Sequence, residues 1–369
     1  MKVLFLTNVP APYRVNFFSE LGKYVDLTVV YERKTASDRN KKWKSDTKEN
    51  FNEIYLKSKI IGSDNSISFG VIKFLKKNQF DHIIIGQYST FTAIIAILYM
   101  KIHKIPFIIN SDGGFINYGE KKLKYKFKHF LISSSNYWLS TGAHTDEYLI
   151  YYGAKKEKIF RYPFTSINKR DILDNFSLVE KNFYKKKLNM PNDSKIVISV
   201  GSFIKRKGMD ILIKASKKLN KNIEVFIVGG KITKEYVDII EKLHIDNITF
   251  VDFMEKEKLL NYYKAADLFV LPTREDIWGL VINEALANGL PVITSEYCGA
   301  GLELIKNNYN GYIINNNENF SDYANKINDF CADIQFLETL SKNCINSIKD
   351  YTIENMAVTT FEILKKIKY

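Results

Sequence analysis

The chain has 369 residues, which is too long for one ordinary hydrophobic core and suits two domains. Hydrophobic residues make up 46% and charged residues 26%, a globular composition that excludes an intrinsically disordered chain. The 54 basic and 41 acidic side chains give a formal charge of +13, which predicts attraction to the phosphates of a nucleotide, a nucleic acid or an anionic membrane.

The amino terminus and the cysteines both favour the cytoplasm. The first apolar run is interrupted by Thr7 and Asn8 and is too short for the core of a signal peptide. The cysteines are widely spaced, form no Cys-x-x-Cys pair and fit neither a disulfide framework nor a zinc site: Cys298, Cys331 and Cys344. We therefore expect a cytoplasmic protein.

The amino-terminal half alternates short apolar runs with segments of helical spacing. Buried strands are predicted at residues 2–7, 27–31, 82–85 and 106–110, and a helix at 15–24. Residues 83–100 carry no charge, but polar residues and Gly86 interrupt them, so they predict a strand, a loop and a helix rather than a membrane span. This alternation predicts a parallel α/β sheet.

Around residues 161–173 the pattern lapses into an irregular basic stretch, which predicts a linker. It then restarts, with strands expected at 195–200, 225–228, 248–251, 268–271 and 291–294, and helices at 209–219, 279–287, 321–350 and 352–368. We predict two doubly wound, Rossmann-like domains, 1–168 and 169–351, with the helix at 352–369 packing back on the first. Ligands of such sheets bind beyond the carboxyl ends of the strands, which predicts a reaction in the cleft between the domains.

The first candidate site is the segment 200–208, in which a predicted strand ends in glycine and three basic residues precede a helix. Glycine lets the backbone approach a ligand closely, and a helix start beside lysine attracts anions. The segment therefore fits a diphosphate. A solvated basic turn before a surface helix is an equally good interpretation of these residues alone.

The second candidate site is the start of the helix predicted at 279–287. Asp276, Leu280 and Glu284 share one face because residues four apart stack on a helix. Apolar neighbours bury part of the Glu284 carboxylate, which then needs hydrogen-bond donors such as sugar hydroxyls. The backbone N–H groups of Gly279 and Leu280 are placed to meet a phosphate. The alternative is an ordinary acidic helix start with a surface glutamate.

The order and separation of these two segments, continued by residues 290–295, Gly299 and 310–311, resemble the GT4 family of retaining glycosyltransferases. The resemblance is specific over residues 195–315. It is weaker at 9–14 and 111–114, which resemble only some members, especially bacterial capsule and surface-polysaccharide enzymes. It implies the GT-B fold, with two facing Rossmann-like domains and an interdomain cleft.

The resemblance also implies the reaction. A hexosyl residue would pass from a nucleoside-diphosphate sugar to a glycan or lipid-linked acceptor, with retention at the anomeric carbon. No cofactor is implied beyond the donor substrate. No Asp-x-Asp pair occurs in the sequence, which together with the resemblance predicts a metal-independent reaction.

Roles follow from the resemblance for the donor side. Lys207 binds the diphosphate, Glu284 holds the ribose hydroxyls, and Asp276 contacts the donor sugar where the family usually has a glutamate. Ser202 stands where an arginine is common, so Lys205 or Arg206 supplies that charge. The remaining expected donor contacts are Gly201, Gly229, Phe253, Trp278, Gly279 and Leu280.

The amino-terminal half departs from the family pattern, because prolines occupy the first loop and no histidine stands at 111–114. Asp112, just beyond the strand predicted at 106–110, is the candidate for a polar contact at the anomeric centre. The alternative is a turn residue, since Asp-Gly-Gly favours turns. Arg14, at the end of the first loop, is a candidate for the acceptor or membrane side.

Residues 121–131 predict a basic amphipathic helix with apolar residues at 123, 127, 130 and 131. One interpretation is an anionic membrane surface, at about 1 kcal/mol per lysine, which would hold the protein at the inner face of the cell membrane. The other is a helix whose apolar stripe packs on the core. The lysines in question are Lys121, Lys122, Lys124 and Lys128.

Two other functions remain open at this stage. A sugar-nucleotide epimerase of the same architecture would need acids and a histidine converging on the sugar. A non-enzymatic phosphate- or nucleic-acid-binding protein would use the basic charge, but the lysines are dispersed and no interleaved aromatic RNA-binding pattern occurs. We therefore expect no nucleic-acid partner.

Overall fold

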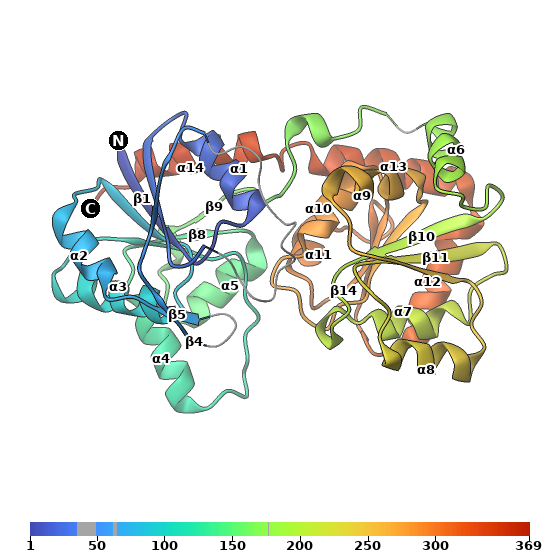
Figure 1. Ribbon diagram of the computed structural model, residues 1–369, viewed down its shortest axis with the longest axis horizontal. Helices are drawn as coiled ribbons and strands as arrows, with labels where there is room; N and C mark the ends of the chain where they lie inside the picture. Colours follow the sequence, from blue (N-terminus) through green and yellow to red (C-terminus); the bar gives the residue numbers. More distant parts are fainter. Residues whose placement is uncertain (35–48, 62–64, 176) are drawn as a thin grey trace. The chain divides into compact units, whose positions relative to one another are not determined.

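A computed structural model describes residues 1–34, 49–61, 65–175 and 177–369, and the chain divides into two compact units. The amino-terminal unit comprises Met1–Ser166 and Tyr351–Tyr369, and the carboxy-terminal unit comprises Ile167–Asp350. Each is built around a parallel sheet with helices on both faces (Figure 1).

The described residues of the amino-terminal unit form a seven-stranded parallel sheet in the order β3-β2-β1-β6-β7-β8-β9. The chain reverses direction across the sheet between β1 and β6, as in a Rossmann fold. A separate antiparallel pair, β4 (Lys59–Ile61) and β5 (Asn65–Ile67), lies beside helix α3. The strands of the sheet are β1 (Lys2–Thr7), β2 (Asp26–Tyr31), β3 (Asn52–Tyr55), β6 (His82–Ile85), β7 (Ile108–Asn110), β8 (Tyr137–Ser140) and β9 (Ile159–Arg161).

Helices α1 (Pro12–Leu21) and α14 (Ile353–Lys366) pack together on one face of this sheet. The other face is covered by α2 (Gly70–Lys77), α3 (Phe91–Ile102), α4 (Lys122–Ser133) and α5 (Ala143–Tyr151), which share one hydrophobic cluster with the strands (Figure 1). Contacts far apart in sequence hold the end of the chain to this unit: Tyr24 stacks on Phe361 with ring centres 5.4 Å apart, and the Tyr137 hydroxyl donates to the Lys368 carbonyl at 2.7 Å.

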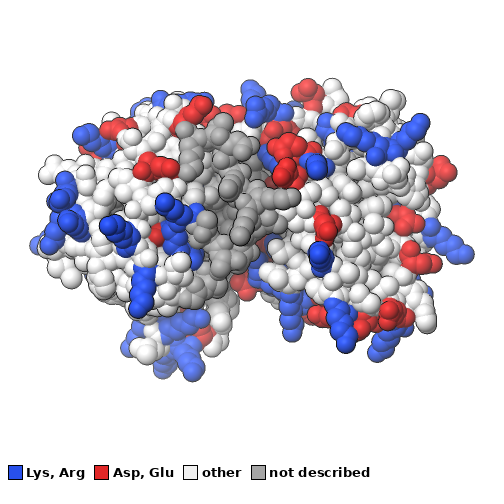
Figure 2. All heavy atoms as spheres, in the orientation of Figure 1, with Lys and Arg blue, Asp and Glu red and all other residues white. Residues whose placement is uncertain are grey.

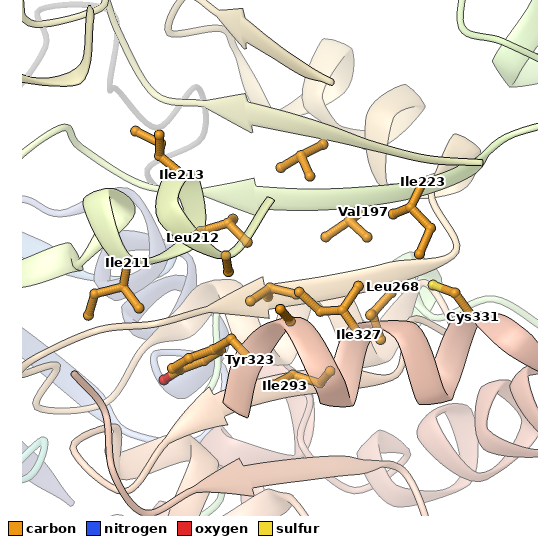
Figure 3. Packing of buried hydrophobic residues seen from close by; sticks show 14 of the residues in the cluster. Val197, Ile211, Leu212, Ile213, Ile223, Leu268, Ile293, Tyr323, Ile327 and Cys331 are labelled. Atoms are coloured by element: carbon orange, nitrogen blue, oxygen red, sulfur yellow. The ribbon is translucent and has the colours of Figure 1, made fainter. Parts of the chain in front are cut away.

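The carboxy-terminal unit has a six-stranded parallel sheet in the order β12-β11-β10-β13-β14-β15, again with the reversal beside its first strand. Side chains of β10, β13, α7 and α12 fill its core, and in Figure 3 Ile327 of α12 points toward Leu268 of β13. The strands are β10 (Lys195–Val200), β11 (Ile223–Val228), β12 (Ile248–Val251), β13 (Leu268–Leu271), β14 (Val292–Ser295) and β15 (Gly311–Ile314). The helices are α6 (Leu178–Lys187), α7 (Met209–Ser216), α8 (Lys234–Leu243), α9 (Lys256–Ala265), α10 (Leu280–Ala287), α11 (Gly299–Leu304), α12 (Phe320–Ala332) and α13 (Ile334–Ile348).

The predicted parallel α/β sheets are confirmed, with differences at helix ends. Helix α1 begins at Pro12 rather than at residue 15, because proline suits the first helical turn, where its missing N–H costs no hydrogen bond. The helix expected at 321–350 is two helices, since Asp333 interrupts it and caps α13 by accepting from the Gln335 and Phe336 N–H groups. Residues 83–100 are indeed a strand, a loop and a helix, and within the described ranges no helix has the length and apolarity to cross a bilayer.

Candidate functional site

The two candidate segments of the carboxy-terminal unit meet where its strand order reverses. β10 and β13 are neighbouring parallel strands, so the loops that follow them leave the sheet at the same edge. The Arg274 N–H donates to the Arg206 carbonyl at 2.8 Å, and the Thr273 hydroxyl donates to the same carbonyl at 2.9 Å. This edge is where doubly wound sheets bind ligands.

Lys207 and Asp276 form an ion pair at this edge. The Lys207 ammonium donates to Asp276 Oδ2, and the Arg206 guanidinium lies 3.6 Å from Asp276 Oδ1. Lys207 and Asp276 side chains are each 13% exposed, whereas Arg206 is 45% exposed. The structure therefore brings together two residues expected to touch the same ligand, and the ligand's approach has to compete with their own attraction.

Helix α10 begins beside this pair. Gly279, the residue before the helix, has φ 98°, and an added Cβ would lie 2.7 Å from Cys298 Sγ and 3.5 Å from Asp276 Oδ2. A side chain is therefore excluded there, and the Asp276 carboxylate lies next to the helix start. The first N–H groups of a helix have no intrahelical acceptor and attract anions. Lysine, arginine and helix amides thus converge on one place.

Glu284 lies one and a half turns into α10 and is half-buried. Its Oε2 accepts a hydrogen bond of 3.1 Å from the hydroxyl of Tyr263 on α9. Burial and the Glu284 carboxylate both raise the pKa of Tyr263 well above its ordinary value, so the phenol stays protonated as a donor. A carboxylate offers about four acceptor positions, and Tyr263 occupies one of them.

Arg274 holds the loop that carries Lys207, and the sequence interpretation missed it. Its guanidinium donates to the Lys205 carbonyl at 2.9 Å, to both carboxylate oxygens of Asp210 at 2.7 and 2.9 Å, and to Glu318 at 2.6 and 3.0 Å. The bonds to Asp210 and Glu318 raise the pKa of Arg274, so its charge is permanent. The signal was its place two residues before Asp276, but no local pattern reveals partners 64 and 44 residues away.

The other expected donor contacts are distributed around the same edge. Gly201 and Gly229 follow β10 and β11, and a Cβ on Gly229 would lie 1.8 Å from the Gly201 carbonyl oxygen, so the two backbones touch. Ser202 and Lys205 are exposed in the loop, Leu280 opens α10, and Phe253 follows β12 with 38% of its surface exposed.

The side chain of Trp278 is placed differently from what a donor contact would require. Its side chain is 4% exposed, and its Nε1 donates to the Asn283 side chain at 2.9 Å. The indole is thus turned into the unit, where it fixes the first turns of α10, because a buried indole N–H needs an acceptor.

Asp112 and Arg14 form a second polar cluster, in the amino-terminal unit. Arg14 donates to Asp112 Oδ1, which also accepts from Asn110 at 2.8 Å and from the Tyr162 hydroxyl at 3.4 Å. Arg14 is 4% exposed and lies among aromatic rings, with Phe164 5.0 Å away. Burial, the largest single influence, opposes its charge, but Asp112 together with Tyr162 and Tyr13 outweighs burial, and the pKa of Arg14 is raised.

This placement corrects the expectation for Arg14. A guanidinium that is buried among aromatic rings does not reach a membrane surface, and Arg14 instead holds the Asp112 carboxylate. Asp112 itself is 28% exposed, just beyond β7, so its carboxylate is reachable while three donors, from Arg14, Asn110 and Tyr162, orient it. Its position is compatible both with a turn residue and with a polar group that contacts a ligand.

Helix α4 and the residue before it, Lys121, carry the four lysines expected on a membrane side, and these lysines differ in exposure. Lys121, Lys122 and Lys124 are exposed. Lys128 instead lies 3.2 Å from Glu120 Oε2 and donates to the Tyr152 hydroxyl at 3.2 Å. Lys128 therefore links α4 to the end of α5, and its charge is not a free surface charge.

No group of three or more His, Cys, Asp or Glu side chains is placed to hold a metal ion within the part of the chain that the structure describes. The three cysteines are unpaired and buried, and burial raises the pKa of Cys298 to about 12. These thiols therefore pack as small apolar groups.

Comparison with known proteins places the carboxy-terminal site in a family. Residues 180–347 match the family described as "Glycosyl transferases group 1". The "Uncharacterized glycosyltransferase MJ1607" of Methanocaldococcus jannaschii is 28% identical over 207 residues, 55% of this chain and 53% of that protein. The "Capsular polysaccharide biosynthesis glycosyltransferase CapM" of Staphylococcus aureus is 30% identical over 198 residues, 52% of this chain and 50% of that protein. The matches thus span about half the length of these curated relatives.

The fold is shared with a solved structure over the whole chain. Anabaena Alr3699/HepE in complex with UDP and glucose aligns with 100% of both chains at a TM-score of 0.79 and 18% identity. This likeness confirms the predicted GT-B fold. The match to the glycosyl transferases group 1 family covers residues 180–347, the range that contains Lys207, Asp276 and Glu284.

Proposed function

We propose that this protein is a retaining glycosyltransferase that moves a hexosyl residue from a nucleoside-diphosphate sugar to a glycan or lipid-linked acceptor in bacterial surface-polysaccharide synthesis. The observation that carries the proposal is the meeting of Lys207, Asp276 and the start of α10 inside the matched domain. The capsule-synthesis relative and the UDP-bound structural neighbour support the choice of pathway and donor. The family match favours transfer over the two alternatives, an epimerase and a nucleic-acid-binding protein.

The donor is held by charge and by hydroxyl contacts. Lys207, assisted by Arg206 and the amides at the start of α10, binds the diphosphate, because fixed positive groups stabilise the charge that develops on the leaving group. Asp276, displaced from Lys207 by the diphosphate, accepts hydrogen bonds from the sugar. Glu284, oriented by Tyr263, accepts from the ribose hydroxyls.

The bond changes balance without a cofactor. The bond between the anomeric carbon and the diphosphate oxygen breaks, and the acceptor oxygen bonds to that carbon on the same face. The acceptor proton passes to the departing diphosphate. The positive groups of the chain take the place of a metal ion in this scheme, and in the amino-terminal unit the residue assigned to the reaction is Asp112, held by Arg14.

Product stereochemistry tests this scheme. Transfer from a nucleotide sugar of known anomeric configuration is followed by proton NMR, with and without EDTA. We expect a product with the donor's configuration at an unchanged rate in EDTA. An inverted product would overturn retention, and loss of the rate in EDTA with recovery on adding Mg²⁺ or Mn²⁺ would overturn the metal-free scheme.

The acceptor side includes a membrane surface. Four exposed lysines of the α4 region, Lys121, Lys122, Lys124 and Lys126, attract anionic headgroups at about 1 kcal/mol each. This holds the protein at the inner face of the cell membrane, where a lipid-linked acceptor is reached. Replacing these four lysines by glutamine is expected to reduce binding to phosphatidylglycerol vesicles at low salt, and unchanged binding would refute the electrostatic contact.

A further inference from the structure

Three neighbouring strands of the carboxy-terminal sheet end around the backbone carbonyl of Thr273. The parallel strands β13, β14 and β15 end at Leu271, Ser295 and Ile314. Thr273 lies beyond the pairing of β13 with β14, which stops at Leu271, so its carbonyl needs an acceptor role outside the ladder. That carbonyl accepts hydrogen bonds from the Ser295 hydroxyl and, at 3.0 Å, from the side-chain amide of Asn317.

The Asn317 side chain is linked in turn to Tyr323 of α12. The Tyr323 hydroxyl donates to Asn317 Oδ1 at 2.6 Å, and Figure 3 shows this hydroxyl directed away from Ile327 and Cys331. Because a carbonyl oxygen only accepts, the Thr273 carbonyl fixes the amide with Nδ2 toward it and Oδ1 toward the phenol. Burial raises the pKa of Tyr323, so the phenol stays protonated as a donor. The hydrogen bonds therefore run in one direction.

The Thr273 hydroxyl extends this chain of hydrogen bonds to the loop that holds Lys207. It donates at 2.9 Å to the carbonyl of Arg206, the residue before Lys207. The two loops also touch through their backbones, since Gly208 has φ 67° and a Cβ there would lie 1.9 Å from the Pro272 carbonyl oxygen. The loop itself contains a single 3-10 turn of three residues. So short a turn has few hydrogen bonds of its own, so contacts from outside have to fix it.

The chain of hydrogen bonds is buried and uncharged. Thr273, Ser295 and Tyr323 are 0% exposed, and Asn317 is 5% exposed. In Figure 2 the charged side chains lie on the surface of the carboxy-terminal unit, whereas these hydroxyls and this amide lie beneath it. Buried polar groups cost free energy unless they are paired, and a buried network whose members are paired holds one arrangement. The network thus confines the Arg206 carbonyl, and the lysine beside it, to one place.

We propose that Thr273, Asn317 and Tyr323 are positioning residues of the donor site, which hold the loop of the diphosphate-binding lysine from the core of the unit. The inference rests on the proposed function. It assigns part of the affinity for the diphosphate to side chains that do not touch the diphosphate. Loss of one hydrogen bond in the chain leaves the charge of Lys207 unchanged but lets its loop move, so the diphosphate meets the ammonium less often.

A set of near-isosteric variants separates positioning from stability. Thr273→Val removes the hydroxyl at nearly constant volume, Thr273→Ser keeps it, and Tyr323→Phe removes one oxygen at the far end of the chain of hydrogen bonds. The control is Thr360→Val on α14, because Thr360 is also buried and donates to a backbone carbonyl, that of Met356, at 2.8 Å, but in the amino-terminal unit. Calorimetry measures the binding of UDP and GDP, and thermal unfolding checks the fold of each variant.

We expect Thr273→Val to weaken nucleoside-diphosphate binding about tenfold and Tyr323→Phe about threefold, while Thr273→Ser and Thr360→Val bind within about twofold of the wild type. Wild-type affinity in Thr273→Val and Tyr323→Phe would overturn the inference. So would a Thr273→Ser variant that binds as weakly as Thr273→Val, because the hydroxyl would then not be the group that matters. If Thr273→Val does not fold, Tyr323→Phe decides by the same comparison with the wild type.

Hydrogen exchange of the loop amides, measured without a ligand, separates this inference from the proposed function. Residues 203–208 are expected to exchange faster in Thr273→Val and Tyr323→Phe than in the wild type and in Thr360→Val, because fewer contacts hold the loop closed. Unchanged exchange in both variants would overturn the inference. Failure of the wild type to bind any nucleoside diphosphate or nucleotide sugar would instead reject the proposed function, and the exchange rates would still decide whether these residues hold the loop.

Discussion

The ammonium of Lys207 and the carboxylate of Asp276 are joined in an ion pair between the loops that follow β10 and β13. Both side chains are 13% exposed, so solvent screens the pair only in part. In the proposed function the diphosphate binds Lys207 and the sugar binds Asp276. On that proposal the donor replaces the ion pair between these two residues by one contact with each of them, so we expect the strength of the pair to set the affinity for the donor.

Asp276→Asn is expected to tighten the binding of UDP or GDP about threefold to tenfold, because Lys207 loses its internal counter-ion, while sugar transfer falls at least about hundredfold. Calorimetry with each nucleoside diphosphate and a transfer assay measure the two effects. The control is Asp171→Asn, which removes another partly exposed carboxylate, 2.8 Å from Lys256. Weaker nucleotide binding by Asp276→Asn would show that the pair orders the site instead of competing with the donor.

Arg274→Lys is expected to weaken nucleoside-diphosphate binding about tenfold, because lysine keeps the charge but loses the planar fork that bridges Asp210, Glu318 and the Lys205 carbonyl. If Arg274 acts by positioning Lys207, adding Arg274→Lys to the Lys207→Ala variant is expected to weaken nucleoside-diphosphate binding little further. Calorimetry on the single and double variants gives the coupling, with the exposed Arg170→Lys as a control. Additive losses would mean that Arg274 acts on the ligand by another route.

The strands and the edge of the sheet that holds the candidate site were predictable from the sequence, and the ion pairs between its side chains were not. Apolar β-branched runs gave the bounds of β10 and β13, and the rule that ligands bind at strand ends pointed to Lys207 and Asp276. Their mutual attraction depends on the loops meeting across the reversal of strand order. Arg274 draws its partners from α7 and from the loop after β15, which no local spacing reports.

Glu284→Gln is expected to reduce transfer at least about hundredfold with little loss of stability, because an amide of the same size cannot replace both acceptor oxygens for the ribose hydroxyls. Tyr263→Phe removes one hydrogen bond to that carboxylate and is expected to cost about fivefold to tenfold. The control is Tyr262→Phe, one residue away on α9. Equal activity of Glu284→Gln and wild type would remove Glu284 from the donor site.

Asp267→Asn tests the electrostatics that hold α6 to the sheet. The Asp267 carboxylate accepts hydrogen bonds from Lys181 and Lys185, each at 3.0 Å, and from the Ile196 N–H at 2.8 Å. The side chains of Asp267 and of both lysines are buried. Removing the carboxylate takes away the charge that both buried ammonium groups bind, which is expected to lower the free energy of unfolding by about 3–5 kcal/mol at pH 7. Urea denaturation measures it, with the exposed Asp193→Asn as the control.

The effect of Asp267→Asn on the free energy of unfolding is expected to depend on pH. Burial alone would raise the pKa of Asp267, but the two lysines and the Ile196 N–H outweigh it and lower the pKa. A carboxyl whose pKa is lower in the folded state stabilises the fold above its unfolded pKa of about 3.9, and that contribution is lost as the pH falls through the folded-state pKa. The gap between wild type and variant is therefore expected to narrow below about pH 4. A constant gap would contradict this assignment.

The orientation of single helices was the least predictable feature. Periodicity identified an apolar stripe on α4 at residues 123, 127, 130 and 131, but within it only Leu131 is buried in the core, where Ile132 also packs, while the other three side chains are exposed. The resemblance likewise predicts a donor contact for Trp278, whereas its side chain is buried in the structure. In both cases tertiary packing, which the sequence pattern does not contain, decided which side chains meet solvent.

The central claim is that Lys207 binds the diphosphate of a nucleotide-sugar donor, and a panel of nucleotide sugars tests it most directly. Binding and hydrolysis are measured for the wild type, for Lys207→Ala and for Lys242→Ala, an exposed lysine of α8 that serves as the charge control. We expect at least one donor to bind and turn over, with affinity lowered about tenfold to hundredfold by Lys207→Ala alone, as for a lost charge-assisted hydrogen bond. A panel in which no nucleotide sugar binds, or in which Lys207→Ala binds as tightly as the wild type, would contradict the claim.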